Sequence, residues 1–136
     1  MNIEHLLKVK APIADVYRTL TTEKGLAAMW TRDLRVSEDV GGVSEFRFAP
    51  DDDKTDMRID QLVPNQKVVW FCIDSHPEWI GTKISFDLTE TAGVTTIILR
   101  HMEWRDVTDY YRLCNYHWAM FLLNLKQYCE KGIVST

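Results

Sequence analysis

The sequence predicts an α+β fold of the helix-grip type, in which a curved antiparallel sheet wraps around a long C-terminal helix and two short helices follow the first strand. Residues 106–132 place large apolar side chains at alternating spacings of four and three, which is the pattern of one helix face. Residues 33–102 show only strand and turn signals. A sheet with one apolar face must cover it, and the terminal helix is large enough to do so. Because no linker interrupts the chain, we expect a single domain over residues 1–136.

The first thirty residues predict one strand and two short helices. Residues 3–10 alternate loosely between apolar and polar side chains and stop at Ala11-Pro12, where proline suits the first turn of a helix. The face of that helix would be formed by Ile13, Val16, Tyr17 and Leu20. A second helix is expected over residues 23–30. Because both helices are short and closely joined, they should form a V-shaped bracket.

The central region predicts six strands joined by short turns. The strands are expected over residues 34–36, 44–48, 55–63, 67–74, 79–90 and 94–102. Short links favour antiparallel pairing between neighbours, so the sheet should be a meander. The acidic residues Asp51, Asp52 and Asp53 lack the spacing of a calcium loop and are expected at a solvated hairpin tip.

The terminal helix is expected to bury one stripe against the sheet. Its members are Val107, Tyr111, Cys114, Trp118, Phe121, Leu125 and Tyr128, widened by Leu122 and Cys129. The opposite side carries Arg112, Asn115, Lys126 and Glu130, which can stay in water. Asp106 and Thr108 are candidate N-caps, and Gly132 suits the position after the last turn.

Composition narrows the classes of function. A net charge of −4 and the lack of a basic patch argue against nucleic-acid binding. Apolar runs are too short for membrane insertion, and the N-terminus does not resemble a signal peptide. The three cysteines show no metal-ligand spacing and are expected to be reduced core thiols in a cytoplasmic protein. We expect no cofactor and no metal.

Several short motifs, taken in order, resemble the START-like or Bet v 1-like superfamily, and within it the Hsp90-ATPase-activator-homologue group. The matching residues are Ala11-Pro12, Val16-Tyr17, Leu20-Thr21, Gly25-Leu26, Trp30, Gly41-Gly42, Phe46, residues 68–72 and 95–101, Trp118, Phe121, Leu122, Leu125, Lys126 and Gly132. The resemblance implies a helix-grip fold whose sheet and helix enclose a cavity for small apolar or amphipathic ligands. It does not imply co-chaperone activity, which belongs to longer proteins with an additional N-terminal domain. His117 stands where the group often has glycine.

Aromatic side chains on the faces expected to point inward are the candidate ligand-binding residues. The full candidate set is Trp30, Phe46, Phe48, Met57, Trp70, Phe86, His101, Tyr111, His117, Trp118 and Phe121. The same side chains would equally suit a filled core. His101 or His117 could serve as a general base beside Tyr111 or Tyr116, and Arg105 could bind an anionic head group.

Residues 68–73 are apolar on both faces, which is unusual for an antiparallel sheet with one wet side. The outer residues Val69, Phe71 and Ile73 therefore predict a homodimer contact.

Three hypotheses on function remain open. The first is a module that binds a small apolar or aromatic, lipid-like molecule. The second is a cyclase-type or hydrolase-type enzyme, and the third is a protein-interaction module of the co-chaperone kind.

Overall fold

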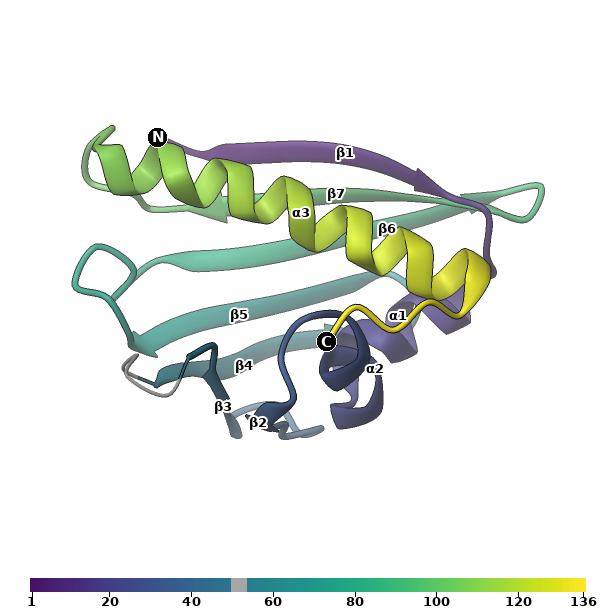
Figure 1. Cartoon of the computed structure of the whole chain (residues 1–136), viewed down its shortest axis with the longest axis horizontal. Coiled ribbons are helices and arrows are strands. Elements are labelled where there is room, and N and C mark those ends of the chain that lie inside the picture. Colours follow the sequence, from purple (N-terminus) through teal and green to yellow (C-terminus); the bar gives the residue numbers. More distant parts are fainter. Residues whose placement is uncertain (50–53) are drawn as a thin grey trace.

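The computed structural model describes residues 1–49 and 54–136, so the predicted acidic hairpin tip at 51–53 lies outside the described residues. In order, the elements are β1 (Ile3–Val9), α1 (Ile13–Thr21), α2 (Glu23–Met29), β2 (Asp33–Arg35), β3 (Val43–Arg47), β4 (Thr55–Val63), β5 (Lys67–Asp74), β6 (Lys83–Thr91), β7 (Val94–Met102) and α3 (Asp109–Lys131). Over this part of the chain the strands form one antiparallel sheet in the order β1-β7-β6-β5-β4-β3-β2. The predicted helix-grip fold is confirmed (Figure 1).

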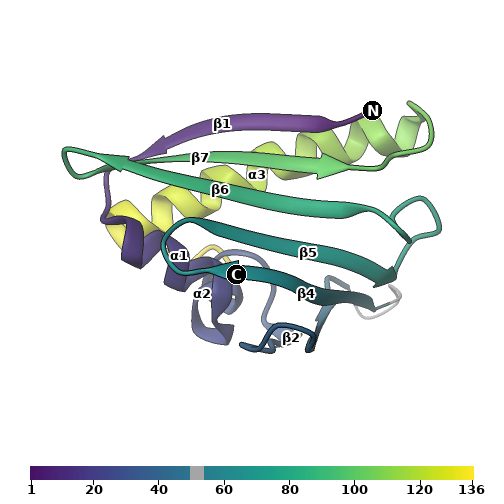
Figure 2. The same ribbon diagram turned by 180° about the vertical axis from the view of Figure 1, so that it is seen from behind.

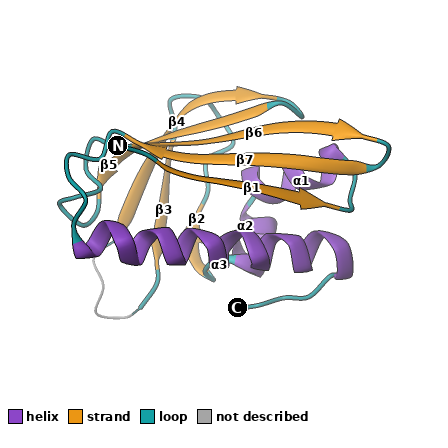
Figure 3. Cartoon of the chain, turned by 90° about the horizontal axis from the view of Figure 1, so that it is seen from above, coloured by secondary structure: helices purple, strands orange, loops and turns teal. Residues whose placement is uncertain are grey.

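The sheet and α3 form two layers with the core between them. In Figure 1 α3 lies in front of the sheet, and Figure 2 shows the uncovered back of the sheet. Figure 3, seen from above, shows α1 and α2 at one end of the strands, beside the C-terminal half of α3. The strands alternate because each sends every second side chain into the core; in β7 these are Thr95, Ile97, Leu99 and His101.

The ends of α3 follow from its capping residues. The hydroxyl of Thr108 accepts a hydrogen bond from the backbone N–H of Tyr111 at 3.1 Å. At the other end Gly132 adopts a left-handed backbone with φ 69°, which ends the helix at Lys131. The predicted caps at Thr108 and Gly132 agree with these contacts. The predicted place of Val107 on the buried stripe was wrong, because this residue precedes the cap and is exposed.

The strand expected over residues 79–90 begins only at Lys83. The preceding residues form a turn, in which the N–H of Trp79 donates to the carbonyl oxygen of His76 and the N–H of Thr82 donates to that of Trp79. Gly81 has a φ of +87°, which a strand does not allow. As a result, the Trp79 side chain turns inward and stacks on Trp118 at 5.8 Å.

Arg105 holds this turn in place. Its guanidinium donates to the carbonyl oxygens of Ile80, at 3.0 Å, and Pro77, at 2.7 Å. These bonds join the segment before α3 to the turn before β6. The hypothesis that Arg105 binds an anionic head group therefore competes with two protein hydrogen bonds, which use two of its five N–H donors and fix the direction of the guanidinium.

Candidate functional site

About half of the predicted ligand-binding residues fill the space between sheet and helix. Phe46, Met57, Trp70, Phe86 and His101 are almost fully buried. Three of these side chains form an aromatic cluster: the Trp70 ring meets Phe86 edge-on at 5.1 Å and lies 6.1 Å from Phe46. This part of the interior is a packed aromatic core.

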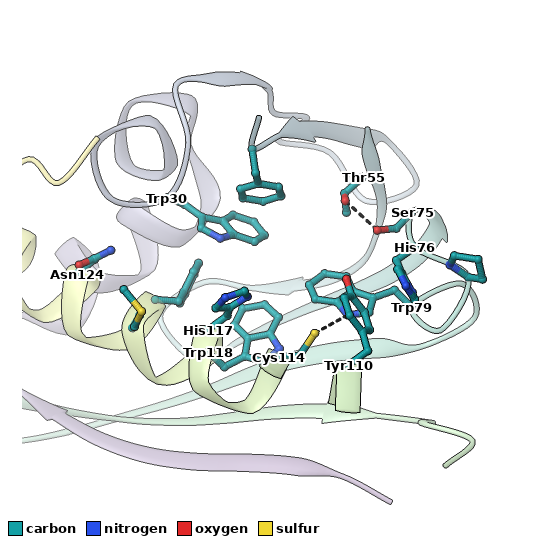
Figure 4. Close-up of a pocket in the computed structure, with 14 residues that line it drawn as sticks. Trp30, Thr55, Ser75, His76, Trp79, Tyr110, Cys114, His117, Trp118 and Asn124 are labelled. Carbon is teal, nitrogen blue, oxygen red and sulfur yellow. Dashed lines mark hydrogen bonds between the residues drawn. The ribbon is translucent and has the colours of Figure 1, made fainter. Parts of the chain in front are cut away.

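A pocket of about 710 Å³ lies beside this core, between α3, the end of α2, the start of β4 and the turn after β5. Figure 4 shows its lining as sticks. The lining residues are Trp30, Phe48, Thr55, Ser75, His76, Pro77, Trp79, Tyr110, Cys114, His117, Trp118, Met120, Phe121 and Asn124. Five of them were predicted: Trp30, Phe48, His117, Trp118 and Phe121.

One end of the pocket is aromatic. Trp30 caps α2 and meets Phe48 at 5.0 Å and Phe121 edge-on at 5.0 Å. Phe48 lies just past β3 and is 44% exposed, so it stands at the rim and not on the inward strand face that the alternation predicted. At this end the Asn124 side chain donates to the carbonyl oxygen of Met29 at 3.4 Å. An aromatic ligand would find ring faces and edges here.

The other end is polar, and the described side chains that line it include no Asp, Glu, Lys or Arg. The hydroxyls of Thr55 and Ser75 lie 2.9 Å apart and share a hydrogen bond. His76 stacks on Tyr110 with ring centroids 3.7 Å apart. Its Nδ1 accepts the backbone N–H of Glu78 at 3.1 Å, so the proton of the ring lies on Nε2. In Figure 4 these residues lie together, away from Trp30 and Asn124.

His101 lies outside the pocket in a closed hydrogen-bond chain. Its Nδ1 accepts from Trp118 Nε1 at 3.0 Å, so its Nε2 carries the proton and donates to the Thr82 hydroxyl at 2.8 Å. That hydroxyl donates in turn to the carbonyl oxygen of Trp79 at 2.6 Å. Burial lowers the pKa of His101 to about 3. Both ring nitrogens are occupied, which leaves neither free to take a proton from a ligand.

The predicted histidine–tyrosine pairing does not occur among the residues named for it. The Tyr111 hydroxyl donates to the carbonyl oxygen of Asn2 at 2.8 Å, away from the pocket. Tyr116 is exposed, and His117 lines the pocket from its open side. The pair that does face the pocket, His76 and Tyr110, was missed. The sequence predicts residues 75–78 only as a link between two strands, and the histidine in that link is the signal that could have drawn attention to this end of the pocket.

The pocket thiol is not set up as a nucleophile. Trp79 Nε1 donates to Cys114 Sγ at 3.2 Å, and burial raises the pKa of the Cys114 thiol. Burial also raises the pKa of Tyr110.

Within residues 1–49 and 54–136, no three His, Cys, Asp or Glu side chains cluster as metal ligands do. None of the helices described here is both long and apolar enough to span a membrane.

The family model for Activator of Hsp90 ATPase homolog 1-like proteins matches residues 10–130. The chain belongs to this family. Among solved structures, the Aha1 dimer from Colwellia psychrerythraea is 36% identical, with a TM-score of 0.88 over 97% of this chain and 98% of that one. MLL2253 from Mesorhizobium loti is 18% identical, with a TM-score of 0.81 over 93% of this chain and 95% of that one. A comparison with curated proteins gave no match.

A third structural neighbour shows the fold inside a longer chain. DynU16, described as a putative protein in the dynemicin biosynthetic locus, is 20% identical with a TM-score of 0.82. The match covers 98% of this chain and 49% of that one. At such identity the likeness concerns the fold alone. The resemblance to the Hsp90-ATPase-activator-homologue group is confirmed by the family match.

Proposed function

We propose that the protein binds a small, uncharged, aromatic or apolar molecule in the pocket between α3 and the turn after β5. The observation that carries this proposal is a pocket of about 710 Å³ with an aromatic end and a hydrogen-bonding end. Pockets of roughly 300–1,000 Å³, mostly apolar with a few placed polar groups, are typical ligand sites.

The lining defines which ligand fits. A flat apolar body suits the end formed by Trp30, Phe48 and Phe121, and a hydroxyl or carbonyl group suits the hydroxyls of Thr55 and Ser75 at the other end. The lining contains no Asp, Glu, Lys or Arg among the residues described. A carboxylate or phosphate would lose its hydration without gaining a cation, which is costly. The ligand should therefore be neutral.

Binding is favoured over catalysis. The enzyme hypothesis needs a base that faces the pocket and is oriented by a partner. His101 is buried with both nitrogens hydrogen-bonded, and His117 lines the pocket without a hydrogen-bond partner among the described residues. His76 and Tyr110 face the pocket but stack face to face, so neither orients the other as a general acid–base pair.

We also propose that the protein forms a homodimer, which the Aha1 dimer from Colwellia psychrerythraea supports through its 36% identity. The surface predicted for this contact is the outer face of β5. There Ile73 is exposed, while Val69 and Phe71 are half-buried.

Thermal unfolding with naphthol, and with naphthoate as a charged match, tests the pocket. A ligand that binds only the native state adds about 2.7 kcal/mol of stability at a hundredfold excess over its dissociation constant. Naphthol and related neutral aromatics should raise the melting temperature and change tryptophan fluorescence, and naphthoate should not.

Two matched variants locate the effect. Phe48→Ala should weaken naphthol binding, because Phe48 forms the aromatic rim. Leu6→Ala, an exposed site outside the pocket lining, should not. The proposal fails if neutral aromatics leave the melting temperature unchanged, or if naphthoate stabilises as well as naphthol.

A further inference from the structure

The outward side of α3 carries a second apolar stripe. Leu113, Tyr116, Met120 and Leu123 are 48%, 60%, 44% and 51% exposed. Their spacings of three, four and three place them in one row along about 15 Å of the helix. We call these four residues the α3 outer stripe. In Figure 1 the side of α3 turned away from the sheet faces the reader.

Such a row is not needed for the fold. α3 already buries Cys114, Trp118, Phe121, Leu122 and Leu125 against the sheet. A helix that is buried on one side usually presents polar residues on the other, and the sequence predicted this arrangement here. Contiguous exposed apolar side chains on a stable element mark an interaction surface.

We infer that the α3 outer stripe is the contact surface of the homodimer, with two α3 helices packed antiparallel across a two-fold axis. This inference rests on the homodimer proposed above and assigns its contact to α3 in place of the outer face of β5 that the sequence predicts. The row is self-complementary in that arrangement. With the axis between Tyr116 and Met120, each Tyr116 lies opposite the second copy's Met120, and each Leu113 lies opposite the second copy's Leu123.

The helix dipoles favour the antiparallel direction. Antiparallel packing opposes the dipoles of the two helices, whereas a parallel pair would align them. With the axis between Tyr116 and Met120, each Asp109 lies opposite the second copy's Gln127. The Asp109 carboxylate pairs with Arg112 of its own helix at 3.1 Å, so this end of the contact brings no uncompensated carboxylate to the second copy.

The outer face of the sheet is a poorer dimer surface. The Arg58 guanidinium lies 4.6 Å from the ring centroid of Phe71 and covers it. On the neighbouring strands Asp87 pairs with Arg100 at 2.7 Å and with Lys67 at 3.6 Å. A contact over Phe71 would strip water from these charged groups, whereas the α3 outer stripe consists of uncharged side chains.

Sedimentation equilibrium of three proteins tests the face. Wild type should be a dimer at micromolar concentration. Leu123→Asp puts a charge into the Leu113–Leu123 contact at both ends of the stripe and should raise the dimer dissociation constant by roughly 30-fold or more, the effect of losing an interface hot spot. Phe71→Asp, the matched change on the sheet face, should leave the dimer intact. Because Leu123 is half exposed, circular dichroism should show an unchanged fold, and Tyr116→Lys provides a second variant of the same row.

The outcomes separate the two proposals. If Phe71→Asp gives monomer and Leu123→Asp and Tyr116→Lys remain dimers, the homodimer stands and the assignment to α3 is overturned. A wild-type protein that stays monomeric at high micromolar concentration overturns the homodimer and this inference together. Met120 belongs both to the stripe and to the pocket lining, but the substituted residues Tyr116 and Leu123 do not line the pocket, so ligand binding can be measured separately on both variants.

Discussion

Removing the buried imidazole of His101 should flatten the dependence of stability on pH. In the native state the ring is neutral, because Trp118 donates to Nδ1 and burial holds the pKa near 3. In the unfolded chain the pKa returns to about 6.5. Between these two values the unfolded state binds a proton that the native state does not, so the free energy of unfolding must fall as pH falls.

The magnitude follows from the two pKa values. At pH 5 an unfolded-state pKa of 6.5 favours the unfolded chain by about 2 kcal/mol relative to pH 7, while the native imidazole remains almost wholly neutral. Carboxylates titrate mostly below this window. A loss of about 2 kcal/mol is a large share of the 5–15 kcal/mol that stabilises a typical domain.

Urea unfolding of wild type and His101→Gln at several pH values between 5 and 7 measures the effect. His101→Gln should be less stable at pH 7, since it disrupts the bonds to Thr82 and Trp118, but its stability should lose about 2 kcal/mol less than wild type on going to pH 5. His117→Gln is the control, because the His117 side chain is exposed and makes no hydrogen bond within the described residues. If the free energy of unfolding changes equally with pH in wild type and His101→Gln, the closed hydrogen-bond chain around His101 is refuted.

Three further substitutions test the fold. Trp118→Ala should lower the free energy of unfolding in urea by roughly 3–5 kcal/mol, because it removes a buried aromatic side chain. A melting temperature within a degree or two of wild type would contradict this. Gly25→Ala should lower the free energy of unfolding by about 1–3 kcal/mol, because the new Cβ would lie 2.3 Å from the carbonyl oxygen of Thr19. This loss should exceed the gain from the better helix propensity of alanine. A stabilised variant would exclude the close contact between α1 and α2. Thr108→Ala should cost about 1 kcal/mol through the lost cap on Tyr111 N, and no change in urea midpoint would argue against that cap.

The order of elements was readable from periodicity, because helix and strand spacings differ over windows of several residues. The directions of side chains just beyond a strand end could not be predicted in this way. Alternation placed Phe48 and Trp79 on strands, yet β3 ends at Arg47 and β6 begins at Lys83. Once the backbone leaves the sheet, the period of two no longer says where a side chain points. Gly81, with its positive φ, was the signal of the turn.

Two features of the surface were missed, for different reasons. The polar end of the pocket joins Thr55 on β4, His76 in a turn and Tyr110 in the first turn of α3, and only the tertiary fold brings them together. The α3 outer stripe is visible in the sequence at Leu113, Tyr116, Met120 and Leu123. It was overlooked because the stronger stripe at Trp118 accounts for the helix as a core element.

The polar end of the pocket gives the sharpest test of how a ligand lies. Ser75→Ala removes one hydroxyl of the Thr55–Ser75 pair and leaves the pocket's shape nearly unchanged. If a ligand hydroxyl reaches this pair, the variant should bind naphthol more weakly by about 1 kcal/mol, roughly fivefold, while its affinity for naphthalene stays the same. Isothermal titration of both compounds against both proteins isolates that difference, since any general loosening of the pocket would weaken naphthalene too. Equal losses for the two compounds, or none for naphthol, would place the ligand's polar group elsewhere and remove Ser75 from the site.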